Sequence, residues 1–127
     1  MELIRLNTEG QEGTFLYELH ENSYFHLEYF LELIREVQVC SQMMLDSNQI
    51  EIRSELNANL FKVYSCFSNS IMCHFNPNDL YEIKNFDIEL IDYNEDLEII
   101  VMYIIQNDYE GVSDFLLTTA NCSEFIK

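Results

Sequence analysis

Hydrophobic residues recur at helical spacing along most of this chain. The most regular series steps by three or four residues, through Ile52, Leu56, Leu60, Val63, Phe67 and Ile71. This spacing puts the apolar side chains on one face of an α-helix and predicts a helix over residues 49–74. Asn48 and Glu51 have the three-residue spacing of a helix-capping pair, so we expect this helix to begin beside them.

A second apolar stripe predicts another long helix, over residues 24–45. One face carries Phe30, Leu33, Val37, Cys40 and Met44, widened by Leu27, Leu31 and Ile34. The other face carries Glu28, Glu32, Arg35, Glu36 and Gln42. Before this helix, Thr14 is a suitable N-cap for a short helix over residues 15–21. Residues 1–6 are compatible with a short strand or with an ordered arm.

The next segments are harder to assign. Residues 76–79 read Asn-Pro-Asn-Asp, a helix-start pattern, and predict a short helix that ends near residue 85. Residues 86–93 partly alternate between apolar and acidic side chains, which fits an edge strand or an irregular segment. Asn94 is a suitable N-cap for a further helix over residues 95–106.

Two apolar stripes mark the buried faces of the last two helices. The first contains Leu97, Ile100, Val101, Ile104 and Ile105. The last helix, over residues 109–119, turns Val112, Phe115 and Leu116 inward. With only three Gly and one Pro, the chain favours helices joined by short turns. We therefore predict an all-α fold, or a mainly α fold with a minor strand near residues 86–92, as a compact bundle of about five to six helices in one domain over residues 1–127.

The composition supports a folded core. Apolar residues make up 48% of the 127 residues, and the chain has nine Phe and eight Tyr, which disordered acidic chains lack. The longest apolar run, residues 99–105, is far shorter than the roughly 20 residues of a membrane-spanning helix. The first residues show no basic region followed by an apolar stretch, so we expect no signal peptide and a cytoplasmic location.

The four cysteines are Cys40, Cys66, Cys73 and Cys122. Without a secretory signal, reduced thiols are expected rather than two disulfides. The first three also fall on apolar helical stripes, where a free Cys behaves as a small hydrophobic residue.

Net charge is the most unusual property of the chain. It has 23 acidic and six basic residues, a formal net charge of −17. A small domain needs a net charge of only roughly 2–8 in magnitude for solubility, and a larger one destabilises the folded state by self-repulsion. A functional use is therefore expected, and a basic protein partner fits it. Nucleic acid and anionic lipid would be repelled, so neither is expected as a partner.

The sequence shows no complete catalytic or metal-binding constellation. It has no Gly-rich phosphate loop and no nucleophile motif. Carboxylate pairs on one helix face are available at Glu28, Glu32 and Glu36, where a solvated helix face is sufficient explanation. The potential metal ligands lack the second close pair of a zinc site; they are His20, His26, Cys66, Cys73 and His74. We therefore expect no enzyme activity, no cofactor and no metal.

The acidic residues concentrate between residues 79 and 114. This segment holds eleven acidic residues and one cation, Lys84, so it carries −10 of the −17. Tyrosines lie among them, and this mixture is common at protein interfaces; they are Tyr81, Tyr93, Tyr103 and Tyr109. We predict a partner-binding surface made of Asp79, Glu82, Asp87, Glu89, Asp92, Tyr93, Glu95, Asp96, Glu98, Asp108, Tyr109 and Glu110.

Residues 13–37, GTFLYELHENSYFHLEYFLELIREV, resemble the start of a family of bacterial immunity proteins. The shared pattern is a small residue, an apolar pair, a Leu-x-Glu-like step and an aromatic-rich helix. The family often carries Trp where this chain has Tyr29 and Phe30. Such proteins neutralise toxins exchanged between competing cells, including those of contact-dependent growth inhibition, and many of these toxins are nucleases with basic clefts. The resemblance implies an acidic inhibitor of such a toxin and assigns no binding residue.

Two other functions stay open on the sequence. A phage-encoded nucleic-acid mimic that inhibits a nuclease or restriction system would also present many carboxylates. An enzyme with an unrecognised acid–base pair is the third possibility. Of the three, the toxin inhibitor accounts best for the charge and for the missing catalytic groups.

Overall fold

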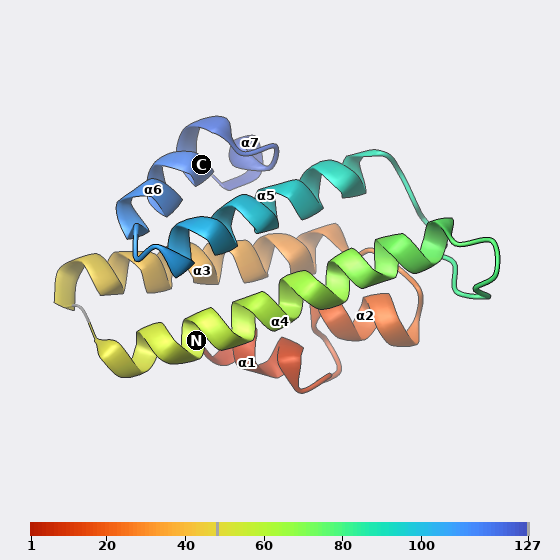
Figure 1. Ribbon diagram of the computed structural model, residues 1–127, viewed down its shortest axis with the longest axis horizontal. Helices are drawn as coiled ribbons and strands as arrows, with labels where there is room; N and C mark the ends of the chain where they lie inside the picture. Colours follow the sequence, from red (N-terminus) through yellow and green to blue (C-terminus); the bar gives the residue numbers. More distant parts are fainter. Residues whose placement is uncertain (48, 127) are drawn as a thin grey trace.

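The computed structural model describes residues 1–47 and 49–126, and these residues form helices and no strand (Figure 1). The all-α prediction is therefore confirmed, and residues 86–92 contain no strand. In chain order the elements are α1 (Glu2–Thr8), α2 (Phe15–Glu21), α3 (Leu27–Ser47), α4 (Ile50–Phe75), α5 (Glu89–Ile105), α6 (Tyr109–Asp114), the π-helical turn η1 (Phe115–Thr119) and α7 (Ser123–Ile126).

Two long helices, α3 and α4, organise the molecule. Helix α3 packs against α1, α2, α4, α6 and α7, and α4 packs against α1, α2 and α5. Figure 1 shows α3, α4 and α5 running in alternating directions along the long axis. The short helices α1 and α2 lie beside α4, and α6 and α7 lie on the other side of α5. Helix α5 therefore lies between α4 and the C-terminal helices.

The predicted apolar stripes form the core. Those of α3 and α4 are buried or half-buried along their whole length. The stripe of α5 is buried except for Ile105, which is 57% exposed. In the middle lies an aromatic cluster whose ring centroids are 5.1–5.9 Å apart, made of Phe15, Phe25, Phe30, Phe67 and Tyr93. Edge-to-face and offset aromatic pairs at such distances stabilise a core beyond the area they bury.

The N-terminal residues form a helix, so neither a strand nor an arm describes them. Glu36 on α3 explains this, because its carboxylate accepts the backbone amides of Leu3 at 3.1 Å and Ile4 at 2.7 Å. A carboxylate at the first free amides of a helix stabilises that helix. Glu36 was expected on the polar face of its helix, and it instead joins α1 to α3. Ile4 is fully buried as a result.

The short helix predicted after residue 76 does not form. Asn76 Oδ1 accepts the backbone amide of Asn78 at 3.0 Å, and Asp79 Oδ1 accepts that of Tyr81 at 2.8 Å. Side chains that bond the backbone two residues further on stabilise turns in competition with helix. Residues 76–88 are consequently irregular.

Two contacts hold this irregular segment against the rest of the protein. The Asn85 side chain pairs with both backbone groups of Phe25, each at 2.8 Å. Ile83 is buried, and its amide donates to Nδ1 of His74 at 3.0 Å. The path of the segment is therefore set by residues distant in sequence.

Helix α5 begins earlier than predicted, at Glu89. Its N-cap is Ile88, which has no capping side chain, and Oδ1 of Asp87 accepts the Glu89 amide at 3.1 Å, so Asn94 is not the cap. Asn94 lies inside the helix, and its side chain exchanges hydrogen bonds with Ser68 of α4 at 3.0–3.2 Å. Asn94 thus joins two helices.

The other predicted caps have different outcomes. Thr14 caps α2 as expected, since its hydroxyl accepts the Tyr17 amide at 3.4 Å. Asn48, expected to cap α4, lies outside the described residues. The last predicted helix is present as α6 followed directly by η1, and Val112, Phe115 and Leu116 are buried as predicted.

Candidate protein-binding site

Nine of the twelve predicted site residues are exposed carboxylates. They lie in three consecutive parts of the chain, the irregular segment, α5 and the beginning of α6, as Asp79, Glu82, Asp87, Glu89, Asp92, Glu95, Glu98, Asp108 and Glu110. Helix α5 has 17 residues and is therefore about 25 Å long. The acids before α5 and those at α6 lie at opposite ends of this helix, and the four on α5 are three residues apart and wind halfway around it. The nine residues, which we call the acidic strip, are therefore spread along α5 and do not form one compact cluster.

The other three predicted residues are buried. Asp96, Tyr93 and Tyr109 are 1%, 7% and 5% exposed, so none of them is part of the exposed strip. Tyr93 belongs to the aromatic cluster through Phe25 and Phe30. The idea that tyrosines supply the exposed contact area of the strip is therefore wrong for Tyr93 and Tyr109.

Asp96 connects α5 to the C-terminal segment. Its Oδ1 accepts the backbone amide of Asn121 at 2.8 Å and the side-chain amide of Asn121 at 3.0 Å. Its Oδ2 accepts the amide of Cys122 at 3.0 Å. Hydrogen bonds from three N–H donors compensate for removing the carboxylate from water. Asp96 is a structural residue that fixes the chain just before α7.

The environment of Cys122 agrees with this arrangement. Burial, and then the adjacent Asp96 carboxylate, raise the pKa of the Cys122 thiol to about 12. The protonated thiol is a poor nucleophile. The four cysteines form no disulfide with one another, as expected from the sequence.

A pocket opens between the first half of α5 and the C-terminal segment. It is lined by Glu89, Asp92, Tyr93, Asn121, Glu124 and Phe125. Burial raises the pKa of Tyr93, and the carboxylates of Glu89, Asp96 and Glu124 act in the same direction. The ring of Tyr93 lies in the core, and its hydroxyl end faces the pocket that Glu89, Asp92 and Glu124 line. We call this the Tyr93 pocket.

The outer face of α5 mixes acidic and apolar side chains. Residues at steps of four and three along this face are exposed; they are Ile91, Glu95, Glu98, Met102 and Ile105. The three apolar members are 37%, 54% and 57% exposed. Apolar contact area bordered by charge is the usual composition of a protein interface.

The strip is not neutralised by the basic residues that the structure describes. Their ion pairs are Met1 with Glu36, Arg5 with Glu9 and Arg35 with Glu28. None of these pairs involves residues 79–114. The exposed carboxylates of α5 therefore form no ion pair with the described basic residues.

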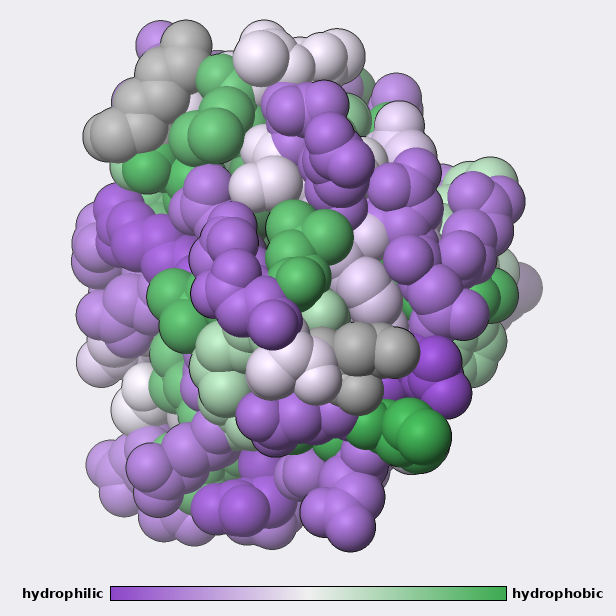
Figure 2. Space-filling model, turned by 90° about the vertical axis from the view of Figure 1, so that its left-hand side faces the viewer, coloured by the Kyte–Doolittle hydropathy of each residue, from purple (hydrophilic) through white to green (hydrophobic). Residues whose placement is uncertain are grey.

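Polar side chains also cover the end of the molecule near the turn between α3 and α4. Figure 2 shows this end as mostly hydrophilic, with hydrophobic side chains in small separate patches. Among the described residues at this end, Figure 2 shows no large continuous apolar patch that would compete with the outer face of α5 as a protein contact.

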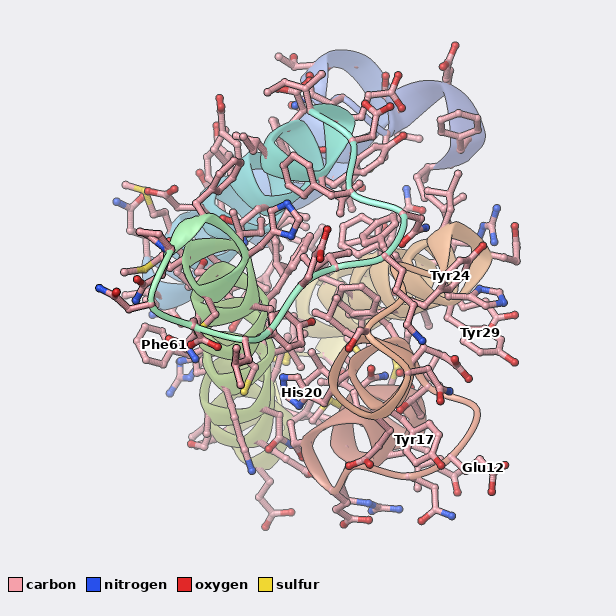
Figure 3. All side chains as sticks on the ribbon, turned by 90° about the vertical axis from the view of Figure 1, so that its right-hand side faces the viewer. Glu12, Tyr17, His20, Tyr24, Tyr29 and Phe61 are labelled. Carbon is pink, nitrogen blue, oxygen red and sulfur yellow. The ribbon has the colours of Figure 1, made fainter. Side chains whose placement is uncertain are left out.

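The histidines have mainly structural partners. Nδ1 of His26 accepts the Tyr29 amide at 3.2 Å near the start of α3, and Nδ1 of His74 accepts the Ile83 amide. His20 lies between α2 and α4 (Figure 3) and lines a shallow pocket with Ser70, Cys73 and Tyr81 among others. In the described part of the chain, no three His, Cys, Asp or Glu side chains are grouped to hold a metal ion.

Comparisons with protein-family models, with curated proteins and with solved structures find no match for this chain. Among residues 1–47 and 49–126, no helix has both the length and the apolar character needed to cross a bilayer.

Sequence reasoning missed three residues of the Tyr93 pocket, Asn121, Glu124 and Phe125. They lie after the last strong apolar stripe, where the four-residue helix α7 is too short to show periodicity. A usable signal existed for Asp96, which lies on the same helical face as Tyr93 and Ile100. We did not use this signal, because the predicted helix start at residue 95 placed Asp96 in the first turn of the helix, where acidic side chains are usually exposed.

Proposed function

We propose that this protein is an inhibitory binding protein of the immunity type, which neutralises a basic toxin, such as a nuclease, by binding it in the cytoplasm. The observation that carries the proposal is the outer face of α5, where the unpaired carboxylates of Glu95 and Glu98 lie between exposed apolar side chains. A nuclease needs a positive cleft to hold phosphates, so its surface is complementary to this face. The resemblance of residues 13–37 to immunity proteins points to the same class.

Long-range attraction gives the mechanism its speed. The net charge of −17 accelerates encounter with a basic partner, because charge complementarity raises association rates by 10- to 1,000-fold in related systems. Apolar contact by Ile91, Met102 and Ile105 would then slow dissociation. Fast capture suits a protein that must act before a toxin damages its target.

The test combines identification of the partner with charge reversal on α5. A tagged chain captures its partner from the source organism, and co-expression should protect cells from that partner's toxicity. We expect Glu95→Lys/Glu98→Lys to slow association about 10-fold at low salt. Both side chains are exposed, and no described hydrogen bond involves either, so the fold should be unaffected.

The matched control is Glu12→Lys/Glu21→Lys, which changes the net charge equally at exposed positions away from α5. Figure 3 shows Glu12 pointing outward near α2. If both double variants bind equally fast, the strip on α5 is not the interface. If the captured partner is not toxic, or co-expression gives no protection, the immunity role is wrong.

A further inference from the structure

The Tyr93 pocket holds a polar group that the protein itself leaves unpaired. Tyr93 is 7% exposed, its ring packs against Phe25 and Phe30, and its hydroxyl forms no hydrogen bond with any described residue. The half-buried Tyr81, by contrast, donates its hydroxyl to the carbonyl of Leu19 at 2.7 Å. The hydroxyl is not one of the unpaired side-chain atoms that are closed off from solvent, so the buried ring presents its oxygen to the pocket. A phenol oxygen that has no partner in the protein and faces a pocket can bind a ligand atom.

The groups around this hydroxyl are hydrogen-bond acceptors. Glu89, Asp92 and Glu124 line the pocket, and their carboxylates only accept. The amide nitrogen of the Asn121 side chain is already occupied by the Asp92 carbonyl and Asp96, each at 3.0 Å. A ligand that complements these groups supplies several N–H or O–H donors and carries positive charge.

No described basic side chain fills this role. The Arg35 side chain contacts the backbone of one lining residue, because its Nη2 donates to the carbonyl of Phe125 at 3.1 Å. Its Nη1 is paired with Glu28 at 3.0 Å, and Arg35 does not line the pocket. The carboxylates of the pocket thus form no ion pair among the described residues.

We propose that the Tyr93 pocket receives the guanidinium group of an arginine on the partner protein. A guanidinium offers five N–H donors in one plane, enough for carboxylates on two sides and for the Tyr93 oxygen. Phe125, which is 40% exposed, provides an aromatic wall on which a guanidinium stacks. This inference rests on the proposed function, because it states how the basic partner is held, but its test needs no partner.

The experiment is a titration of the ¹⁵N-labelled protein with N-acetyl-arginine amide, followed by NMR. We expect saturable shifts of the amides of Tyr93, Asn121 and Glu124, with a dissociation constant of about 10 mM or below. N-acetyl-lysine amide should bind more weakly, and uncharged N-acetyl-citrulline amide should not saturate. Absence of saturation by arginine, or equal binding of lysine, overturns the proposal.

Two variants and a matched control separate a built pocket from general charge attraction. Tyr93→Phe removes only the hydroxyl and should weaken arginine binding about threefold to tenfold. Glu89→Gln/Glu124→Gln should weaken it at least about tenfold. Glu110→Gln/Asp114→Asn removes the same charge from exposed positions of α6 and should have little effect. Equal losses in the two double variants would overturn the pocket.

The two proposals fail in different ways. If arginine does not bind while Glu95→Lys/Glu98→Lys still slows capture of the toxin, the inhibitor proposal stands and the pocket proposal is wrong. If arginine binds in the pocket while no toxic partner exists, the pocket is real and the immunity role is wrong.

Discussion

At the scale of single residues, Glu95 and Asp96 show how neighbouring acids differ in role. Glu95 is exposed on the outer face of α5, whereas Asp96 is 1% exposed and accepts hydrogen bonds from Asn121 and Cys122. From the sequence we predicted both residues to belong to one acidic surface. Charge alone cannot separate them; the helical phase of the two positions does, since only Asp96 lies on the buried stripe with Tyr93 and Ile100.

Replacing Asp96 should destabilise the protein much more than replacing Glu95. Asp96→Ala leaves the buried Cys122 amide and the Asn121 amide without an acceptor, at an expected cost of about 3 kcal/mol. Glu95→Ala should change the free energy of unfolding by less than about 0.5 kcal/mol. Denaturant unfolding measures both values.

Thiol labelling of Cys122 is a second measurement of the effect of Asp96→Ala. Cys122 is fully buried, so reagents should label it slowly in the native protein and faster in Asp96→Ala. Equal stability and equal labelling of the two variants would show that Asp96 does not fix the C-terminal segment.

At the scale of elements, the long helices were predictable and the short ones were not. Helices α3 and α4 contain 21 and 26 residues, enough for apolar periodicity to identify them and their buried faces. Helix α1 depends on Glu36, which is more than 30 residues away in sequence. The local sequence of residues 1–8 does not predict this contact with Glu36.

In the irregular segment 76–88, by contrast, we predicted a helix that does not form. Asn76 and Asp79 suggested a helix start, but the same side chains also favour turns, and the tertiary contacts of Ile83 and Asn85 favour an irregular path. Where one residue type serves two local structures, distant contacts decide between them.

Asn85 should therefore matter more than its exposed position suggests. Asn85→Ala removes both hydrogen bonds to the Phe25 backbone and should cost about 1–2 kcal/mol. Asn78→Ala, in the same segment, removes a side chain with no described hydrogen bond and should cost less than about 0.5 kcal/mol. Unfolding free energies and the hydrogen-exchange rate of the Phe25 amide give the comparison. Equal costs would mean that Asn85 does not anchor the segment.

At the scale of the whole molecule, the all-α class followed from periodicity, whereas the location of the charge did not. The acidic segment was found as a stretch of sequence, but its separation into an exposed strip, a pocket and one buried carboxylate required the arrangement of α5 against α7. The pocket in particular combines residues about 30 positions apart, which no spacing rule connects.

Self-repulsion should make the stability of this protein depend on salt. The Debye length falls from about 30 Å at 0.01 M salt to about 8 Å at 0.15 M, so repulsion among the exposed acids weakens over this range. We expect the melting temperature to rise between these two concentrations.

Glu12→Lys/Glu21→Lys reduces the net charge from −17 to −13 and should therefore show a shallower rise. A melting temperature of the wild-type chain that stays flat or falls over this range would contradict self-repulsion as a cost of the charge.

The buried carboxylate of Asp96 also affects how the attraction for a partner responds to ionic strength. Mobile ions screen charges at the surface, such as Glu95 and Glu98, far more than a charge enclosed by protein. The Asp96 carboxylate already helps to raise the pKa of Tyr93 at the pocket, and Asp96 forms no ion pair with a described cation. A cation bound in the pocket would therefore keep its attraction to Asp96 even in concentrated salt. Capture would become slower there, while the complex, once formed, would retain part of its lifetime.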